Sequence, residues 1–319
     1  MLFSSTIDEM KPDISYLLNE AIMNNISKII VEGRDDIQFY ENLAENINKD
    51  IEVLAIENIS GYSEGCSSVI DFIKDLSDII GGEEQDYGYI LGIIDRDCRY
   101  YRQEIPFGLD DLLLVLNFYS YESHFFSKNT ITMVINHLTY ASIKLLQNNI
   151  CIEFIERKIL RKIDELYYCS LEALKNACEE NYQNVLGYGT KYNKIFNPQK
   201  LLISQVLSKK TDLDEYARQK SISKDDIKLI ANGKWLLSWF THQLLSEIDK
   251  LPNLCCNNST NINQCQYCKT EKNDKCLYRS KTTINTSDNK YLQDLENFII
   301  ALYDEPALDY IKERIQSLH

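Results

Sequence analysis

The sequence is poor in glycine and proline and has no long apolar run. It contains 11 Gly and 5 Pro among 319 residues, which is typical of a helix-rich chain, and no low-complexity tract is present. No uninterrupted run approaches the roughly 20 apolar residues of a membrane-spanning helix. No basic segment followed by an apolar stretch opens the chain. We therefore expect a soluble, cytoplasmic protein without membrane association.

Positive charge is also scarce. Lys and Arg number 34 against 48 Asp and Glu, so the net charge is −14. This balance argues against non-specific binding of polyanions, which depends on many cations that neutralise phosphates. Any contact with nucleic acid must be local, or be assisted by a metal ion or a partner. The apolar fraction of 44% is that of a globular protein, long enough here for two domains.

Apolar spacing divides the chain into an α/β part and a helical part. The expected elements of the first part are a helix over 7–25 with an N-cap at Ser4–Thr6, a strand over 28–31, a helix over 37–47, a strand over 51–56, a helix over 69–80, a strand over 89–94 and a strand over 112–118. Alternating strands and helices predict a mainly parallel sheet flanked by helices. The pattern turns almost wholly helical near residue 127, most clearly over 152–177. We therefore place an α/β metal-binding domain at 1–126 and a mostly helical domain at 127–319.

Two acidic clusters stand where apolar strands end. Glu32 ends the first strand, and Asp36 lies about one helical turn further on. If the third strand continues through Asp95 and Asp97, both carboxylates share one face. Parallel strands bring their carboxyl ends to one crevice, and Mg²⁺ and Mn²⁺ prefer carboxylate oxygens. The clusters predict a divalent metal site, with a pair of solvated loops or helix caps as the alternative.

The same residues resemble the Toprim signature. The motif Val31–Asp36, followed at a distance by Ile94–Asp97, is similar to the Mg²⁺-binding motifs of topoisomerases, primases and OLD-type nucleases. It is closer to the primase and OLD forms. The segments Phe118–Phe126 and Asn232–Leu237 resemble later motifs of a bacterial Toprim family that includes the nuclease effector of the PARIS anti-phage defence system. No matching motif is found after residue 250.

This resemblance implies a Mg²⁺- or Mn²⁺-dependent nuclease. It implies that Glu32, Asp36, Asp95 and Asp97 bind one or two metal ions, or that Glu32 acts instead as general acid or base, with Glu122 as an extra ligand. Such ions promote in-line displacement at a phosphodiester. The resemblance further implies an anti-phage effector that attacks RNA, such as tRNA, under the control of an ABC-type ATPase partner. A homodimer is compatible with it.

Other functions are compatible with the same motifs. A Toprim fold can serve as a regulatory or interaction subunit that binds a metal or nucleotide without cutting. Retention of all four carboxylates favours the enzyme. Polynucleotide synthesis and topoisomerisation fit less well, because the chain shows neither the accompanying primase modules nor a transesterifying context among its 21 tyrosines.

Ten cysteines in an intracellular chain suggest metal binding rather than disulfides. One C-x₈-C-x₂-C-x₇-C array lies in the polar segment 255–276 and consists of Cys256, Cys265, Cys268 and Cys276. A C-x₂-C turn readily donates two thiolates to Zn²⁺, and Cys255 could take the place of Cys256. The array predicts a structural zinc site, and the alternative is a mobile loop of free thiols.

Arginines follow the second acidic cluster. Arg96, Arg99 and Arg102 lie on the expected loop after the third strand, where they could neutralise a scissile phosphate. The alternative is that they are solvated or pair with Asp110 and Asp111.

A second basic stretch, with interleaved aromatic residues, lies between residues 186 and 220. Its Lys191, Lys194 and Lys200 are candidate contacts to RNA or DNA, because lysines contact phosphates while aromatic rings stack on bases. The alternative is an ordinary solvated face.

Overall fold

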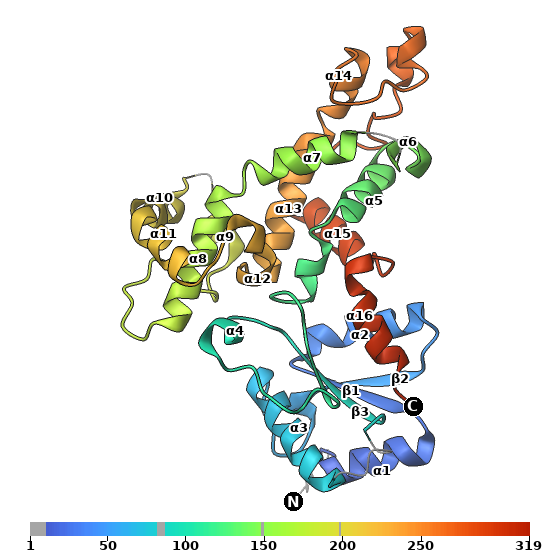
Figure 1. Cartoon of the computed structure of the whole chain (residues 1–319). Helices are drawn as coiled ribbons and strands as arrows, with labels where there is room; N and C mark the ends of the chain where they lie inside the picture. Colours follow the sequence, from blue (N-terminus) through green and yellow to red (C-terminus); the bar gives the residue numbers. More distant parts are fainter. Residues whose placement is uncertain (1–10, 82–86, 148–149, 198) are drawn as a thin grey trace, which may run out of the picture. The chain divides into compact units, whose positions relative to one another are not determined.

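The structure is a computed structural model that describes residues 11–81, 87–147, 150–197 and 199–319 (Figure 1). The chain divides into two compact units. The first contains the chain up to Arg96, Glu104–Asn117 and Pro306–His319, and the second contains Asp97–Gln103 and Phe118–Glu305.

A parallel sheet forms the centre of the first unit. The elements of this unit are α1 (Ile14–Asn24), β1 (Ser27–Val31), α2 (Arg34–Asn46), β2 (Ile51–Ala55), the 3₁₀ turn η1 (Ile56–Asn58), α3 (Cys66–Ile80), β3 (Ile90–Ile94), β4 (Leu113–Val115), the 3₁₀ turn η7 (Pro306–Leu308) and α16 (Asp309–Gln316). Its four strands are all parallel and stand in the order β2-β1-β3-β4. The expected α/β fold with a parallel sheet flanked by helices is therefore confirmed.

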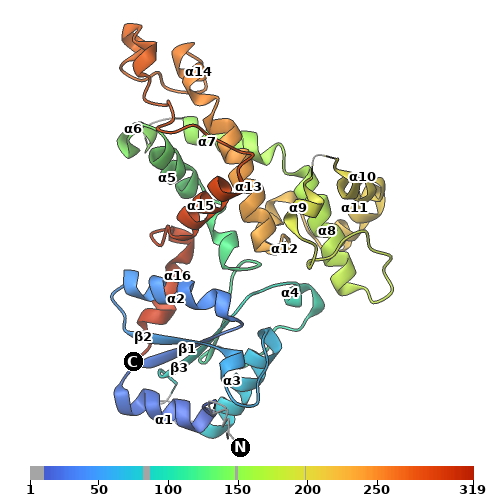
Figure 2. The ribbon, with the colours of Figure 1, turned by 180° about the vertical axis from the view of Figure 1, so that it is seen from behind.

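Helices cover both faces of this sheet. α1 and α3 lie on one face, and α2 and α16 lie on the other (Figures 1 and 2). Leu17 of α1 and Ile73 of α3 pack with Ile30 and Ile94 in one buried core. The two central strands, β1 and β3, are buried along their whole length, because each is covered from both sides.

Several expected boundaries in this unit differ from the structure. α2 and α3 each begin three residues earlier than expected. α1 begins at Ile14, where the side chain of Asp13 accepts a hydrogen bond from the N–H of Tyr16, so residues 11–13 precede the helix. The expected N-cap at Ser4–Thr6 lies outside the described residues. The fourth strand covers Leu113–Val115 alone, because only these residues pair with β3.

The second unit is helical. Its elements are α4 (Arg99–Arg102), the 3₁₀ turn η3 (Tyr121–Phe125), α5 (Lys128–Leu138), α6 (Ile143–Gln147), α7 (Cys151–Leu160), α8 (Asp164–Cys178), α9 (Tyr192–Ile195), α10 (Leu201–Ser208), α11 (Lys210–Gln219), η4 (Lys224–Asp226), α12 (Ile227–Ile230), α13 (Gly233–Ile248), α14 (Leu251–Cys256), η5 (Cys268–Thr270), η6 (Asn273–Lys275) and α15 (Asn289–Ile300). This confirms the expected helical C-terminal region. The helical pattern that is clearest over 152–177 corresponds to two helices, α7 and α8, which are joined by a turn at residues 161–163.

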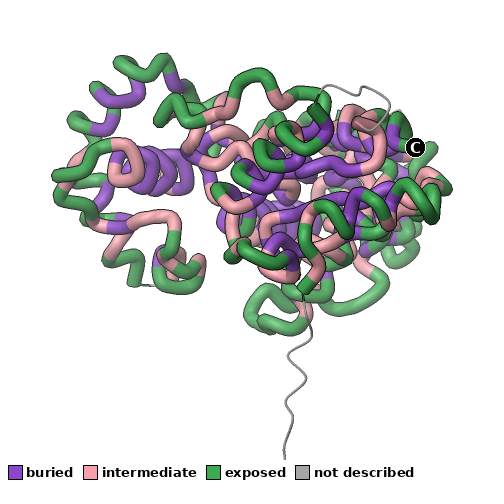
Figure 3. Tube along the Cα trace, turned by 90° about the horizontal axis from the view of Figure 1, so that it is seen from below, coloured by how far each residue is buried: buried purple, intermediate pink, exposed green. Residues whose placement is uncertain are grey.

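Helix α13 is the centre of the second unit. It packs against η3, α7 and α15, while α8 packs against α10, α11 and α12. Figure 3 colours the trace by burial, and buried and exposed residues alternate along the helices. Within the described part of the chain, no helix combines the length and the apolar character that crossing a bilayer requires.

Candidate functional site

Two of the predicted metal ligands meet in the first unit. Glu32 follows β1 and Asp95 follows β3, and these strands are parallel neighbours. The backbone N–H of Asp95 donates a hydrogen bond of 2.8 Å to Oε1 of Glu32. Both residues are half-buried. The carboxylate that follows β1 is thus held by the backbone that follows β3, its neighbour in the sheet.

Asp36 lies in the first turn of α2. Its N–H donates to the carbonyl oxygen of Gly33 at 3.2 Å, and the residue is half-buried. A carboxylate in this position is favoured by the partial positive charge at a helix N-terminus. This placement therefore stabilises α2 whether or not Asp36 also binds a metal.

Glu64 is a further carboxylate near the end of β1. Its Oε1 lies 3.3 Å from the position that a Cβ on Gly33 would take. The N–H of Gly65 donates to the carbonyl oxygen of Glu32 at 3.0 Å, which holds this turn against the strand end. Glu64 lies outside the sequence motifs, and its signal is a glycine-bounded turn after β2, the strand beside β1.

Tyr310, in α16, belongs to the same unit as Glu32 and Asp95. Its hydroxyl accepts a hydrogen bond of 2.9 Å from the N–H of Asn117. Burial raises the pKa of Tyr310, and the negative charge of Asp95 raises it further. The sequence gives no signal for this residue, because Tyr310 lies far from the acidic motifs along the chain.

Asp97 belongs to the second unit. Its N–H donates to the carbonyl oxygen of Tyr119 at 3.0 Å, and its Oδ1 accepts from the N–H of Cys98 at 2.6 Å. Its φ angle of 48° is left-handed, and β3 ends at Ile94. The strand therefore does not continue through Asp95 and Asp97, and the shared-face condition is not met.

Glu122 is buried in η3, against the start of α13. The hydroxyl of Ser120 donates to its Oε2. A Cβ on Gly233 would lie 2.6 Å from that oxygen and still closer to Oγ of Ser120, so only glycine fits at this contact. The two later sequence motifs, Phe118–Phe126 and Asn232–Leu237, thus lie against each other.

The arginines near Asp97 fall in both units. Arg96 ends a segment of the first unit, and Arg99 and Arg102 form the ends of α4 in the second. Arg96 and Arg99 are half-buried. Burial, with the charge of Asp97, raises the pKa of the Cys98 thiol to about 11, so this cysteine is protonated at neutral pH.

The three predicted lysine contacts differ in their surroundings. Lys191 precedes α9, Lys194 lies within it, and both are exposed. Nζ of Lys200 lies 2.6 Å from Oε1 and 2.8 Å from Oε2 of Glu165. The first two lysines are therefore better placed than Lys200 to contact a phosphate.

Aromatic residues of this stretch pack against other aromatic residues. Tyr192 and Phe196 are stacked with ring centroids 4.8 Å apart. The ring of Tyr188 lies 5.0 Å from Tyr119 and 6.0 Å from Trp235. Tyr188 donates its hydroxyl to the backbone of the protein, so it serves the packing of the helical unit.

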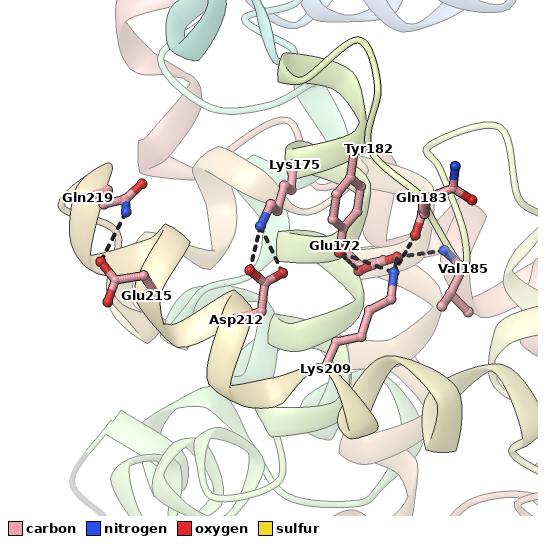
Figure 4. Close-up of polar contacts among 9 residues, drawn as sticks. All are labelled: Glu172, Lys175, Tyr182, Gln183, Val185, Lys209, Asp212, Glu215 and Gln219. Carbon is pink, nitrogen blue, oxygen red and sulfur yellow. Dashed lines mark hydrogen bonds and ion pairs between the residues drawn. The ribbon is translucent and has the colours of Figure 1, made fainter.

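Lys209, in the same basic stretch, is held by a buried carboxylate (Figure 4). Its Nζ lies 2.9 Å from Oε1 of Glu172, a fully buried residue. Glu172 also accepts hydrogen bonds of 2.6 Å from the hydroxyl of Tyr182 and from the N–H of Val185. This lysine therefore balances a buried charge and helps to fix the segment after α8.

Four cysteines converge elsewhere in the second unit. The thiols of Cys255, Cys265, Cys268 and Cys276 lie within 4.8 Å of one another, and all four residues are buried. The N–H of Cys265 donates to Sγ of Cys255 at 3.2 Å. A buried set of four thiols can hold a metal ion.

Cys255 takes the place predicted for Cys256 in this set. Adjacent residues of a helix point about 100° apart, and α14 directs Cys255 inward, fully buried, while Cys256 stays partly exposed. Sγ of Cys256 still lies 3.4 Å from Sγ of Cys268. The fifth cysteine is thus a neighbour of the four-thiol cluster rather than a member.

Backbone contacts favour the thiolate at one position of the cluster. Burial raises the pKa of Cys265, but hydrogen bonds with the backbone of Leu277 and Cys268 outweigh it and bring the pKa to about 7. Burial raises the pKa of Cys276 to about 12. Because metals bind the thiolate form, these backbone contacts favour metal binding at Cys265.

The sequence matches no protein-family model, and no curated protein matches it. The resemblance to Toprim proteins therefore stays a prediction from the motifs.

Proposed function

We propose that the first unit carries a Mg²⁺-dependent site that cleaves phosphodiester bonds, with RNA as its substrate class. The observation that carries this proposal is the contact between Glu32 and the backbone of Asp95 at the ends of two neighbouring parallel strands. This edge of an open parallel sheet is where α/β proteins bind ligands. Its oxygen donors suit a hard divalent cation.

Glu32, Asp36 and Asp95 are the proposed ligands from this unit, and Asp97 is the further ligand that the motif predicts. Glu32 serves either as a ligand or as the general acid or base. The N–H of Asp95 holds Oε1 of Glu32 in place, so the carboxylate is oriented before substrate binds. When bound, Mg²⁺ supplies stabilisation of the charge that develops on the phosphodiester oxygens and activates water.

A matched pair of variants tests this proposal. Glu32→Gln keeps the shape of the side chain but removes its charge, and should abolish cleavage of tRNA and of single-stranded RNA in Mg²⁺ or Mn²⁺. Glu41→Gln, at an exposed position of α2, is the control and should cleave at the parental rate. Cleavage by Glu32→Gln at the parental rate over a Mg²⁺ titration would overturn the site assignment.

The second candidate is a regulatory or interaction subunit that binds a metal without cutting. It predicts that the parent chain binds Mn²⁺ in a Glu32-dependent manner but hydrolyses none of a panel of tRNA, single-stranded RNA and DNA substrates. The same titrations therefore distinguish the two functions. The ATPase partner and the anti-phage role rest on the motif resemblance, and co-purification with a co-expressed ATPase tests them.

The four-cysteine cluster is proposed to bind one structural Zn²⁺ ion. Four buried thiols from one polar, loop-rich segment match the donor set and closed character of structural zinc sites. Because this segment has few helical turns and a small apolar core, a metal would supply much of its stability. Elemental analysis of protein made in zinc-supplemented medium should find about one zinc per chain.

A further inference from the structure

A polar hollow lies beside the cysteine cluster. Its volume is about 530 Å³. Its lining comes from α6, from the loop between α14 and η5, and from η5 itself, and consists of Lys144, Leu145, Asn258, Ser259, Thr260, Ile262, Asn263, Gln264 and Lys269. The four-thiol cluster includes Cys255 in the last turn of α14, Cys265 in this loop and Cys268 at the start of η5, so the metal site and the hollow share one structural element.

The polar residues of this lining are two lysines, three amide residues and two hydroxyl residues, and no acidic residue belongs to it. Lys144 and Lys269 supply ammonium groups, and both are exposed. Amide and hydroxyl groups supply the remaining polar atoms. In a chain with 48 acidic residues, a hollow of this size without a carboxylate is a local exception to the overall negative charge. Such a lining suits a phosphate-bearing ligand.

The surrounding segment is positively charged as well. Residues 255–281 contain five Lys and Arg but only two Asp and Glu, a formal excess of three positive charges, against a deficit of 14 for the whole chain. Lys272 and Lys275, beyond the hollow, are exposed. This positive charge extends past the hollow along the same loop, which fits a chain of phosphates better than a single small anion.

The lining also argues against a protein partner. Its apolar members are Leu145 and Ile262, and Ile262 is only 3% exposed. The core of a protein interface is usually more apolar than this. Tyr267, half-buried in the same loop between Cys265 and Cys268, does not line the hollow, but it is the kind of residue on which an unpaired base stacks.

We propose that this hollow and its loop form a binding site for single-stranded nucleic acid, in which Lys144 and Lys269 contact phosphates. The residues of this site are different from those of the acidic sheet edge and from the lysines at α9. Binding at this site does not depend on cleavage. The proposal goes beyond the proposed cleavage activity because it names a surface that binds a single strand of nucleic acid. The structural zinc site would then act indirectly, by holding the loop in its binding shape.

Fluorescence anisotropy with a labelled oligouridine or oligothymidine dodecamer tests this site without added Mg²⁺. The variant Lys144→Gln with Lys269→Gln should weaken binding about tenfold. Its log–log salt slope should be shallower by about 1.4, since each phosphate contact on a single strand contributes about 0.7. Comparison of the two dodecamers shows whether RNA or DNA is preferred.

The control variant is Arg161→Gln with Lys290→Gln, two exposed basic residues of the second unit that lie outside the basic stretch 186–220. It changes the net charge equally and should bind as the parent does. Parental affinity and salt slope in the Lys144/Lys269 variant would overturn the proposal, as would equal losses in both double variants. If the parent chain binds the dodecamers but cleaves no substrate, the binding site is supported and the proposed nuclease activity is rejected.

Discussion

The hydroxyl of Tyr310 accepts a hydrogen bond from the backbone N–H of Asn117 at 2.9 Å, which ties the last helix of the chain to the segment after β4. This contact joins residues that are 193 positions apart. The charge of Asp95 acts on the same tyrosine. The C-terminal helix is thus part of the unit that holds the candidate acidic site.

Replacing Tyr310 by Phe should lower the free energy of unfolding by about 1 kcal/mol, because the N–H of Asn117 loses its acceptor. Urea denaturation measures this difference. Tyr140→Phe is the control, because Tyr140 is 59% exposed, and its unfolding curve should match the parent. An equal midpoint for all three proteins would show that the hydrogen bond contributes nothing.

Replacing Gly233 by Ala should destabilise the protein by more than 1 kcal/mol, because the added methyl group collides with Ser120 and Glu122 in a packed contact. Gly189→Ala is the matched control. A Cβ there has no atom within 4 Å, so the change should be nearly neutral. Thermal unfolding of both variants decides the matter, and equal melting temperatures would contradict the close approach of η3 to α13.

Replacing Cys255 by Ser should release the proposed zinc, whereas Cys256→Ser should retain it, because only Cys255 belongs to the four-thiol set. Elemental analysis of the two purified variants measures the metal content. The spacing of the array allows either cysteine, so this pair separates the structural assignment from the sequence prediction. Zinc loss in Cys256→Ser with retention in Cys255→Ser would reverse the assignment.

Buried His124 should make stability depend on pH. Burial lowers its pKa from 6.5 to about 4. Its Nδ1 forms a hydrogen bond of 2.9 Å with the carbonyl oxygen of Tyr121. Between these pH values the unfolded chain binds more protons than the folded one, so stability falls as the pH drops. Each unit of pKa shift corresponds to about 1.4 kcal/mol, so the free energy of unfolding should fall by about 3 kcal/mol in total as the pH drops through this range.

Urea unfolding at pH 7, 5.5 and 4.5 measures this effect. His124→Gln should show a flatter change of unfolding free energy with pH than the parent, although it is less stable at pH 7. An identical pH dependence in the two proteins would mean that His124 titrates normally in the folded state.

Local patterns predict the strands and the acidic residues after them. β1 and β3 are short apolar runs that end at Val31 and Ile94, and burial on both faces is what such runs indicate. The positions of Glu32 and Asp95 at strand ends follow directly. Their contact does not, because it depends on β3 pairing with β1 in the strand order β2-β1-β3-β4.

The sequence by itself determined the elements, since apolar periodicity, caps and cysteine spacing act over a few neighbouring residues. Only the tertiary structure decided which of them meet. Helical phase selected Cys255 over Cys256, and the return of α16 brought Tyr310 under the influence of Asp95. The physical reason is that such contacts depend on burial and shape complementarity between segments far apart in the chain, which no local pattern specifies.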